Sequence, residues 1–315
     1  MTGLHLVQNE TLKIYKRKIF WIMLAILAAL ILLLAFLDFK SANTHDHWQK
    51  DLKADQTVDM GSAGDAMEKS FINQMKDEQL ANDYHIKHNI PPLFDDTVLG
   101  FVNFSNDVAA AIISVFIVII AGSIVSQEYS WGTIKLLLIR PVDRWKILLS
   151  KFIASIIIGV VFLIASFILS LLFGMLFFGF DFGESHYIYA RGGVVHDVSV
   201  FYHFLQTYGS HIVDIIMISS FAFMLSTIFK SNALAIGLSV FISYAGSMAV
   251  SILSMFNDKI PKYLFFLNTN LYQYVEGPSL LPDTSLGFSV TVLVIYFIIF
   301  MAISFVVFQK RDVTA

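Results

Sequence analysis

Residues 152–180 read FIASIIIGVVFLIASFILSLLFGMLFFGF, a run that contains no charged side chain. A helix needs about 20 apolar residues to cross a hydrocarbon core of about 30 Å, because every backbone polar group must be satisfied within the segment. This run is longer than one perpendicular crossing requires, so we expect it to tilt or to project beyond the bilayer. The stretch therefore predicts an integral membrane protein built of helices.

The composition of the whole chain agrees with a membrane protein. Of its 315 residues, 57% are hydrophobic and only 14% are charged, and the mean hydropathy is +0.70. The 30 Phe residues outnumber the 21 Lys and Arg residues. So many large apolar side chains cannot be accommodated by a protein whose surface faces water. Soluble, disordered, fibrous and nucleic-acid-binding classes are thereby excluded. The chain has no cysteine, which rules out disulfides, thiolate catalysis and cysteine-based metal sites.

Six stretches of the chain qualify as spans, so we predict an all-α integral membrane protein with six transmembrane helices. The predicted spans are residues 19–37, 108–126, 152–180, 212–229, 233–256 and 286–308. Asp214 is the only formal charge inside any of them. Because a charge at mid-membrane costs about 2.5–3.5 kcal/mol on insertion scales, this near-absence itself supports spanning.

The distribution of charge predicts the orientation of the chain. With a cytoplasmic N-terminus, the inside segments sum to +8, and the rest of the chain, in which Asp214 is counted, sums to −11. Inside would lie residues 1–18, 127–151, 230–232 and 309–315, and outside would lie residues 38–107, 181–211 and 257–285. Because cytoplasmic loops are enriched in Lys and Arg, we expect both termini in the cytoplasm and the protein in the cell membrane, of a bacterium.

Three of these segments carry patterns of their own. Residues 1–18 predict an amphipathic helix that lies on the anionic inner leaflet. Residues 38–107 predict a small helical cap outside the membrane, too poor in apolar residues to fold without support from the membrane part or a partner. Residues 257–285 contain an apolar stretch too short to cross, which predicts an interfacial or re-entrant hairpin.

The most informative inside segment is 127–151, because its charged and apolar residues alternate where a plain connection could be much shorter. Residues 135–140 read KLLLIR, which predicts a short amphipathic helix that Pro141 stops. We expect Glu128 to pair with Arg140 or Arg144, since partly buried charges usually find partners. Gly132 fits a close approach, a helix break or an ordinary loop.

These residues resemble the permease subunits of ATP-binding-cassette (ABC) transporters of the type-2 exporter superfamily. The resemblance rests on the basic amphipathic N-terminus, the six-span layout with a large first outside loop, and two motifs. The first motif is Glu128, followed by Gly132-Thr133, by Arg140-Pro141-x-x-Arg144 and by Lys151. The second motif is the ending Gln309-Lys310-Arg311-Asp312. The resemblance implies that 128–151 includes a coupling helix that sits on a separate ATPase subunit. It also implies an N-terminal elbow helix and a second contact at Lys230.

The resemblance also implies partners and cargo. The sequence has no G-x-x-x-x-G-K-[ST] phosphate loop, so this chain is expected to be no enzyme and to hold no cofactor, with ATP and magnesium bound by the partner ATPase. A second permease copy or a related permease, and membrane lipid, would complete the assembly. The expected cargo is a hydrophobic or amphipathic antimicrobial peptide, drug or lipid-like compound, exported for antibiotic resistance or immunity.

Other functions remain open from the sequence. The chain also fits a sodium-ion exporter permease, or a non-transporting sensor or assembly protein whose outside cap binds a ligand. A membrane-embedded enzyme would need convergent acids or histidines inside the spans, and a G-x-S-x-G or H-E-x-x-H motif is absent. We therefore predict no catalytic residues.

Several polar residues each allow a functional and a structural interpretation. In the fifth span, serines recur every four residues, at Ser239, Ser243, Ser247 and Ser251, and we favour close helix packing over a substrate route. We expect Asp107 and Asp214 to be acids near the outer ends of their spans rather than groups that meet a cationic substrate.

Two histidine motifs raise the question of a metal site. His45-Asp46-His47 and His85-x-x-His88 offer imidazole and carboxylate ligands. Nothing marks a closed four-ligand set, so we expect solvated loop histidines and no metal.

Overall fold

The structure is a computed structural model of the chain, and it describes residues 3–41, 48–55, 66–134, 142–256, 259–274 and 284–311. Within these residues, six helices are long and apolar enough to cross a membrane. They are α2 (Lys18–Ser41), α5 (Val98–Ser123), α8 (Arg144–Phe178), α9 (Val200–Ile228), α10 (Asn232–Phe256) and α12 (Leu286–Lys310). The predicted all-α membrane fold with six spanning helices is confirmed.

Several spanning helices are longer than the sequence predicted, and α5 begins at Val98 rather than at residue 108. α9 begins at Val200 rather than at residue 212, because Ser199 caps it by accepting a hydrogen bond from the backbone N–H of Tyr202. α8 begins at Arg144 rather than at residue 152, so one helix of 35 residues runs out of the predicted inside loop. Polar residues extend α8 and α9 beyond the apolar stretches that hydropathy detects.

The shorter elements lie between the spans. The helices are α1 (Gly3–Tyr15), α3 (Trp48–Asp55), α4 (Ala66–His88), α6 (Ser126–Ser130), η1 (Pro261–Tyr263), α11 (Phe265–Asn268) and η2 (Leu271–Tyr274). The strands β1 (His186–Arg191) and β2 (Val194–Ser199) pair antiparallel, with His186 opposite Ser199 and Arg191 opposite Val194. Gly192 and Gly193 both have positive φ and form the two-residue turn between them, as a type I′ hairpin requires.

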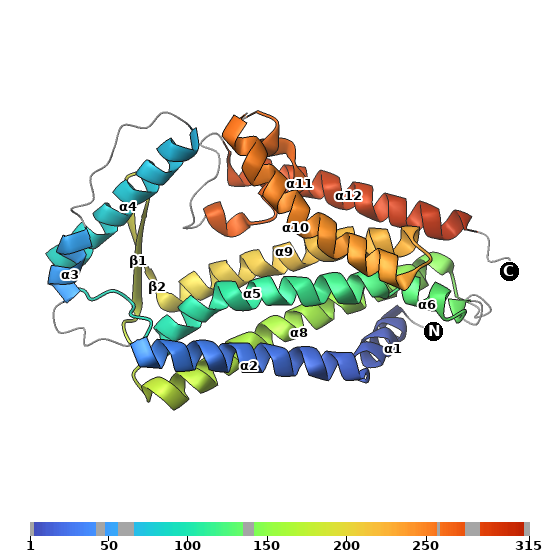
Figure 1. Ribbon diagram of the computed structural model, residues 1–315, viewed down its shortest axis with the longest axis horizontal. Coiled ribbons are helices and arrows are strands. Elements are labelled where there is room, and N and C mark those ends of the chain that lie inside the picture. The colour runs from blue at the N-terminus through green and yellow to red at the C-terminus, as the bar shows by residue number, and fades with distance from the viewer. Residues whose placement is uncertain are drawn as a thin grey trace.

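The molecule has two distinct ends (Figure 1). Both chain termini, α1 and α6 lie at one end of the bundle, and α3, α4 and the hairpin lie at the other. Residues 38–107, predicted as a cap, contain the helices α3 and α4 but also the first ten residues of α5, and the hairpin beside α4 was not predicted. α4 joins the hairpin because the Asp77 carboxylate accepts hydrogen bonds of 2.8 Å from the backbone N–H groups of both Gly192 and Gly193.

Residues 259–274, the described core of the 257–285 segment, form short helical turns that pack into the bundle. Phe265 lies 6.0 Å from Phe221 of α9 and 5.2 Å from Phe300 of α12, measured between ring centroids. The buried Asn268 side chain donates to the backbone oxygens of Lys262 and Leu264. These contacts pack the segment between spanning helices. Residues 257–258 and 275–283 lie outside the described residues.

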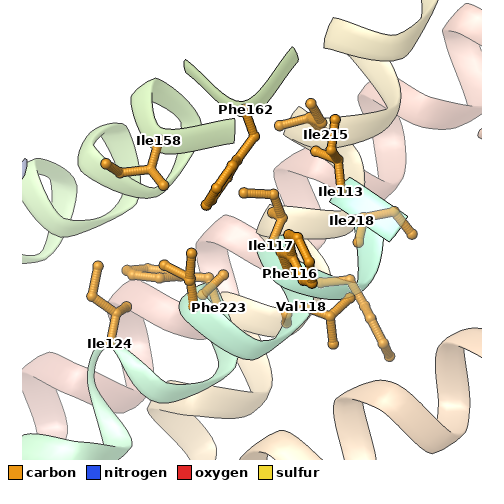
Figure 2. Packing of buried hydrophobic residues seen from close by; sticks show 14 of the residues in the cluster. Ile113, Phe116, Ile117, Val118, Ile124, Ile158, Phe162, Ile215, Ile218 and Phe223 are labelled. Atoms are coloured by element: carbon orange, nitrogen blue, oxygen red, sulfur yellow. The ribbon is translucent and has the colours of Figure 1, made fainter. Parts of the chain in front are cut away.

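The core is centred on α5, which contacts α2, α8, α9 and α10. Figure 2 shows Ile113, Phe116 and Ile117 meeting Ile158 and Phe162 of α8. From α9, Ile215, Ile218 and Phe223 complete the cluster. Because lipid is as apolar as these side chains, close van der Waals packing rather than water exclusion holds the helices together.

Gly159 of α8 marks the tightest of these contacts, and it supports a stability prediction. A Cβ at this position would lie 2.6 Å from Ile215 Cγ2 and 3.1 Å from Ile117 Cδ1. We expect Gly159→Leu to cost about 1–3 kcal/mol or more, because the added side chain must push α8 away from α5 and α9. Thermal unfolding of the detergent-solubilised protein measures this loss.

The matched control is Gly237→Leu on α10, where a Cβ would meet nothing within 4 Å. Equal melting temperatures for the two variants would show that α8 does not pack on α9 as described.

Candidate functional site

The candidate site is a buried ion cluster at the end of the bundle that carries both termini. Lys151 of α8 is only 1% exposed. Its Nζ atom lies 2.7 Å from Glu10 Oε2 of α1 and 2.5 Å from Glu128 Oε1 of α6. An ammonium cannot be buried at such a depth without a carboxylate partner, and here there are two. We call Lys151, Glu10 and Glu128 the Lys151 junction.

Glu10 reaches the junction because α1 packs along α8. Leu6, Glu10 and Ile14 recur every four residues and form the buried face of the helix. The predicted amphipathic helix exists, but its buried face rests on protein, while Leu12 and Tyr15 remain exposed. The signal that sequence reasoning missed is a carboxylate in the middle of that stripe.

The local charges keep Glu10 ionised. Burial alone would raise the pKa of the Glu10 carboxyl, but Lys151 and Lys13 together hold it below its ordinary value of 4.5. Lys13 Nζ lies 2.5 Å from Glu10 Oε1, so each carboxylate oxygen of Glu10 meets an ammonium group.

Glu128 has a different partner from the one that the sequence suggested. Glu128 pairs with Lys151, since the short helix α6 presents Glu128 to the second turn of α8. The pairing of Glu128 with Arg144 is therefore a wrong prediction: Arg144 Nη1 donates to the backbone oxygen of Gln309 at 3.4 Å. Arg140 and Pro141 lie outside the described residues. Within those residues, Glu128 Oε2 is buried and has no hydrogen-bond partner.

A second link ties α6 to the turn between α9 and α10. Ser130 Oγ donates to the backbone oxygen of Lys230 and accepts from the backbone N–H of Asn232, both at 3.0 Å. Ser226 Oγ accepts from the N–H groups of Val125 and Ser126. The two inside segments singled out in the sequence, 127–151 and 230–232, are thus in direct contact.

The C-terminal end of α12 joins the same cluster. The Arg311 guanidinium donates to the backbone oxygens of Thr227 and Ile228, at 2.7 and 2.5 Å, and so satisfies carbonyls at the end of α9. It also lies 4.9 Å from the ring centroid of Tyr129, in cation–π range. The ending that contributed to the resemblance therefore has a structural role at α6.

The remaining predicted residues lie on the surface of this end. Gly132 adopts φ +71° and a Cβ there would meet nothing within 4 Å, so it is a turn glycine that ends α6 and not a point of close approach. Thr133 Oγ1 donates to the backbone oxygen of Glu128. Beside them, the side chain of Trp131 is 65% exposed and Lys230 is exposed. A large exposed aromatic next to basic groups fits a partner or a headgroup layer.

The serine face of α10 divides into a packed and an unpacked part. Ser239 is buried, and its Oγ lies 3.3 Å from where a Cβ on Gly122 of α5 would stand. Ser243 and Ser251 are half-buried and Ser247 is exposed. All four hydroxyls donate to the carbonyl oxygen four residues earlier. Close packing within the chain is found only at Ser239.

The histidine motifs lie elsewhere. His45 and His47 fall outside the described residues. The expectation that His85 is a solvated loop histidine is wrong: it is buried on α4, with Nδ1 2.8 Å from the backbone oxygen of Ile90. The His88 ring lies against Tyr84. Among the described residues, no group of three or more His, Asp and Glu side chains could hold a metal ion.

The lowered pKa of Glu10 predicts a pH dependence for the docking of α1. Its contribution to docking is fully present above the ordinary pKa of 4.5 and is lost as the pH falls through the lower pKa of the folded state. A spin label on Leu12→Cys, at an exposed position of α1, should become mobile below that pH. In Glu10→Gln the label should be mobile already at neutral pH. A label equally immobile in both proteins at neutral pH would contradict a role for Glu10 in docking.

The fold and the site define a multi-pass, all-α membrane protein with an ion cluster that joins α1, α6 and α8. The chain belongs to the family described as "Protein of unknown function (DUF2705)", whose model matches residues 67–314. It is 38% identical over 316 residues to "Uncharacterized protein YhcI" of Bacillus subtilis, covering 98% of this chain and 99% of that protein. It is 30% identical to "Uncharacterized membrane protein YdbK" of the same organism, over 70% of this chain and 85% of that one.

Proposed function

We propose that this chain is the membrane-spanning permease subunit of an ATP-driven ABC exporter that moves a hydrophobic or amphipathic substrate outward. The observation that carries the proposal is the Lys151 junction. It unites Glu128 and Lys151, which bound the loop that resembles a coupling element, with the N-terminal helix that resembles an elbow helix.

The junction supports the proposal for a mechanical reason. A permease must take up a movement made by another subunit, through a rigid element packed against that subunit. The Lys151 junction fixes α6 to α8, and Ser130 fixes α6 to the turn that joins α9 and α10. A displacement of α6 would therefore move the ends of three spanning helices together.

The division of labour follows from the sequence. No phosphate loop occurs in the 315 residues, so ATP and magnesium would be held by a separate ATPase subunit. Exposed Trp131 and Lys230 would contribute to the surface that meets it. A second permease copy or a related permease would complete the translocation route.

The orientation is part of the proposal. The charge of +8 on the inside segments, against −11 on the rest of the chain including Asp214, favours cytoplasmic termini in the cell membrane. Both termini and α6 share one end of the bundle (Figure 1), so a cytoplasmic N-terminus would also place the coupling surface toward the ATPase.

The double variant Arg140→Glu and Arg144→Glu tests the docking surface. We expect it to abolish co-purification of an ATPase that carries a phosphate loop, because charge reversal across an interface costs several kcal/mol. An ATPase encoded in a neighbouring reading frame would be the first candidate to assay. The matched control is Lys76→Glu with Lys87→Glu, the same change of charge on exposed positions of α4 at the other end. Undiminished co-purification with the Arg140 and Arg144 variant would refute docking at this loop.

A further inference from the structure

A polar cavity lies among the spanning helices, away from the Lys151 junction. Its volume is about 340 Å³, and it is bounded by α5, by α9 and by the segment 269–272. The lining residues that carry the argument below are Asp107, Ala111, Ser114, His211, Asp214 and Tyr272. We call this space the α5–α9 cavity.

Two carboxylates face the cavity. Asp214 is the middle residue of the 29-residue helix α9, and its Oδ2 accepts a hydrogen bond of 2.9 Å from Ser114 Oγ of α5. Asp107 lies nearer the outer end of α5 with a side chain that is 69% exposed. We expected both to be acids near the outer ends of their spans. The structure places Asp214 at the middle of the helix α9 and brings both carboxylates onto one cavity.

The carboxylates meet no permanent positive charge among the described lining residues. None of these residues is Lys or Arg. His211 Nε2 lies 3.0 Å from Asn106 Nδ2, a contact in which the amide donates to the ring nitrogen. Asp107 Oδ1 lies 3.8 Å from the same ring nitrogen, so a protonated His211 would form an ion pair with Asp107, and Asp214 has no such pair among the described lining residues.

The remaining walls suit an organic cation better than a bare metal ion. Ala110, Ala111 and Leu271 supply an apolar wall, and Tyr272, an aromatic residue of the kind that can bind a cation, is also among the lining residues. A metal ion needs several ligand atoms at short distances, and no described group of three His, Asp and Glu side chains meets that need. An ionisable residue inside a span is costly and is typically retained for a ligand or ion pathway.

We propose that the α5–α9 cavity binds the ammonium group of an amine-bearing amphipathic ligand, with Asp214 and Asp107 as its anionic partners. The alkyl part of the ligand would lie against the alanine and leucine wall. Binding does not depend on the proposed export, but the role of this cavity as the substrate site of the exporter rests on that proposed function.

The absence of native cysteine allows a direct binding test on the full chain in lipid nanodiscs. Ala111→Cys places a single thiol on an exposed lining position. Butylammonium, which is small and water-soluble, should slow the reaction of this thiol with a charged thiosulfonate reagent in a saturable way. Butanol and butyrate at the same concentrations should not, since the first lacks the charge and the second carries the wrong one.

Variants assign the effect to the carboxylates. In the Ala111→Cys background, Asp214→Asn should weaken protection by butylammonium roughly tenfold or more, because the amide is similar in size but uncharged. Asp107→Asn, at an exposed side chain with little structural role, should weaken it as well. Glu78→Gln removes one carboxylate from exposed α4 and should leave protection unchanged.

Three results would overturn the proposal. They are equal protection by butanol, protection by sodium chloride but not by butylammonium, and unchanged protection in both Asp214→Asn and Asp107→Asn. The two proposals fail separately. Loss of butylammonium binding with ATPase co-purification intact refutes only the cavity assignment, whereas binding without any ATPase partner refutes the exporter.

Discussion

Replacing Lys151 by Met should release α1 from the bundle and destabilise the protein by about 3–5 kcal/mol. The variant keeps the volume of the side chain but leaves Glu10 and Glu128 buried without the ammonium that both contact. Removing one member of a buried ion cluster is costly because the remaining charges are no longer compensated. Thermal unfolding and the mobility of the spin label at position 12 measure the two consequences.

Lys146→Met provides the matched control on the same helix. Lys146 pairs with Asp143 at 2.6 Å, but both side chains are about half exposed, and such pairs contribute about 0–1 kcal/mol. Adding Glu10→Gln and Glu128→Gln to Lys151→Met should recover part of the stability, since the buried charges are then removed together. If Lys151→Met melted like Lys146→Met, the cluster would not hold α1 in place.

A single introduced cysteine should react with a membrane-impermeant reagent in intact cells only if it lies at the outer end of the bundle. Glu78→Cys on exposed α4 should react with a membrane-impermeant maleimide in intact cells, and Lys230→Cys should react only after permeabilisation. The expected contrast is large because a bilayer excludes the reagent from one side entirely. The native chain contains no cysteine and gives no background. The reverse labelling pattern would overturn the orientation and with it the cytoplasmic docking surface.

The six spanning helices could be predicted because an apolar stretch long enough to cross a bilayer is stable there as a helix, which satisfies its own backbone hydrogen bonds. The true start of α9 was missed since His203, Gln206 and His211 interrupt its apolar pattern. In the structure His203 is buried, with Nε2 2.8 Å from Asn103 Oδ1. This hydrogen bond stabilises, inside the bundle, a polar side chain that a hydropathy scale counts against a spanning helix. The hairpin 186–199 was missed because its strands are short and lie between Gly-containing turns.

The candidate site could be predicted in part. Glu128 and Lys151 were singled out, but their mutual contact depends on α6 folding back toward α8, which no local pattern specifies. Glu10 was missed because a carboxylate in an amphipathic helix is ordinarily placed on its water-facing side. The α5–α9 cavity was missed for a related reason, since Asp107 and Asp214 are distant in sequence and meet only through helix packing.

The central claim is that this chain couples a separate ATPase to transport, and ATP hydrolysis by the purified assembly tests it most directly. A tag on this chain should bring down a phosphate-loop ATPase from native membranes, and the eluate should hydrolyse ATP. In proteoliposomes that hydrolysis should respond to an amphipathic amine, and the Lys151→Met protein should elute without it. Recovery of intact wild-type chain with no ATPase and no ATP hydrolysis, from membranes that contain the neighbouring gene product, would contradict the account.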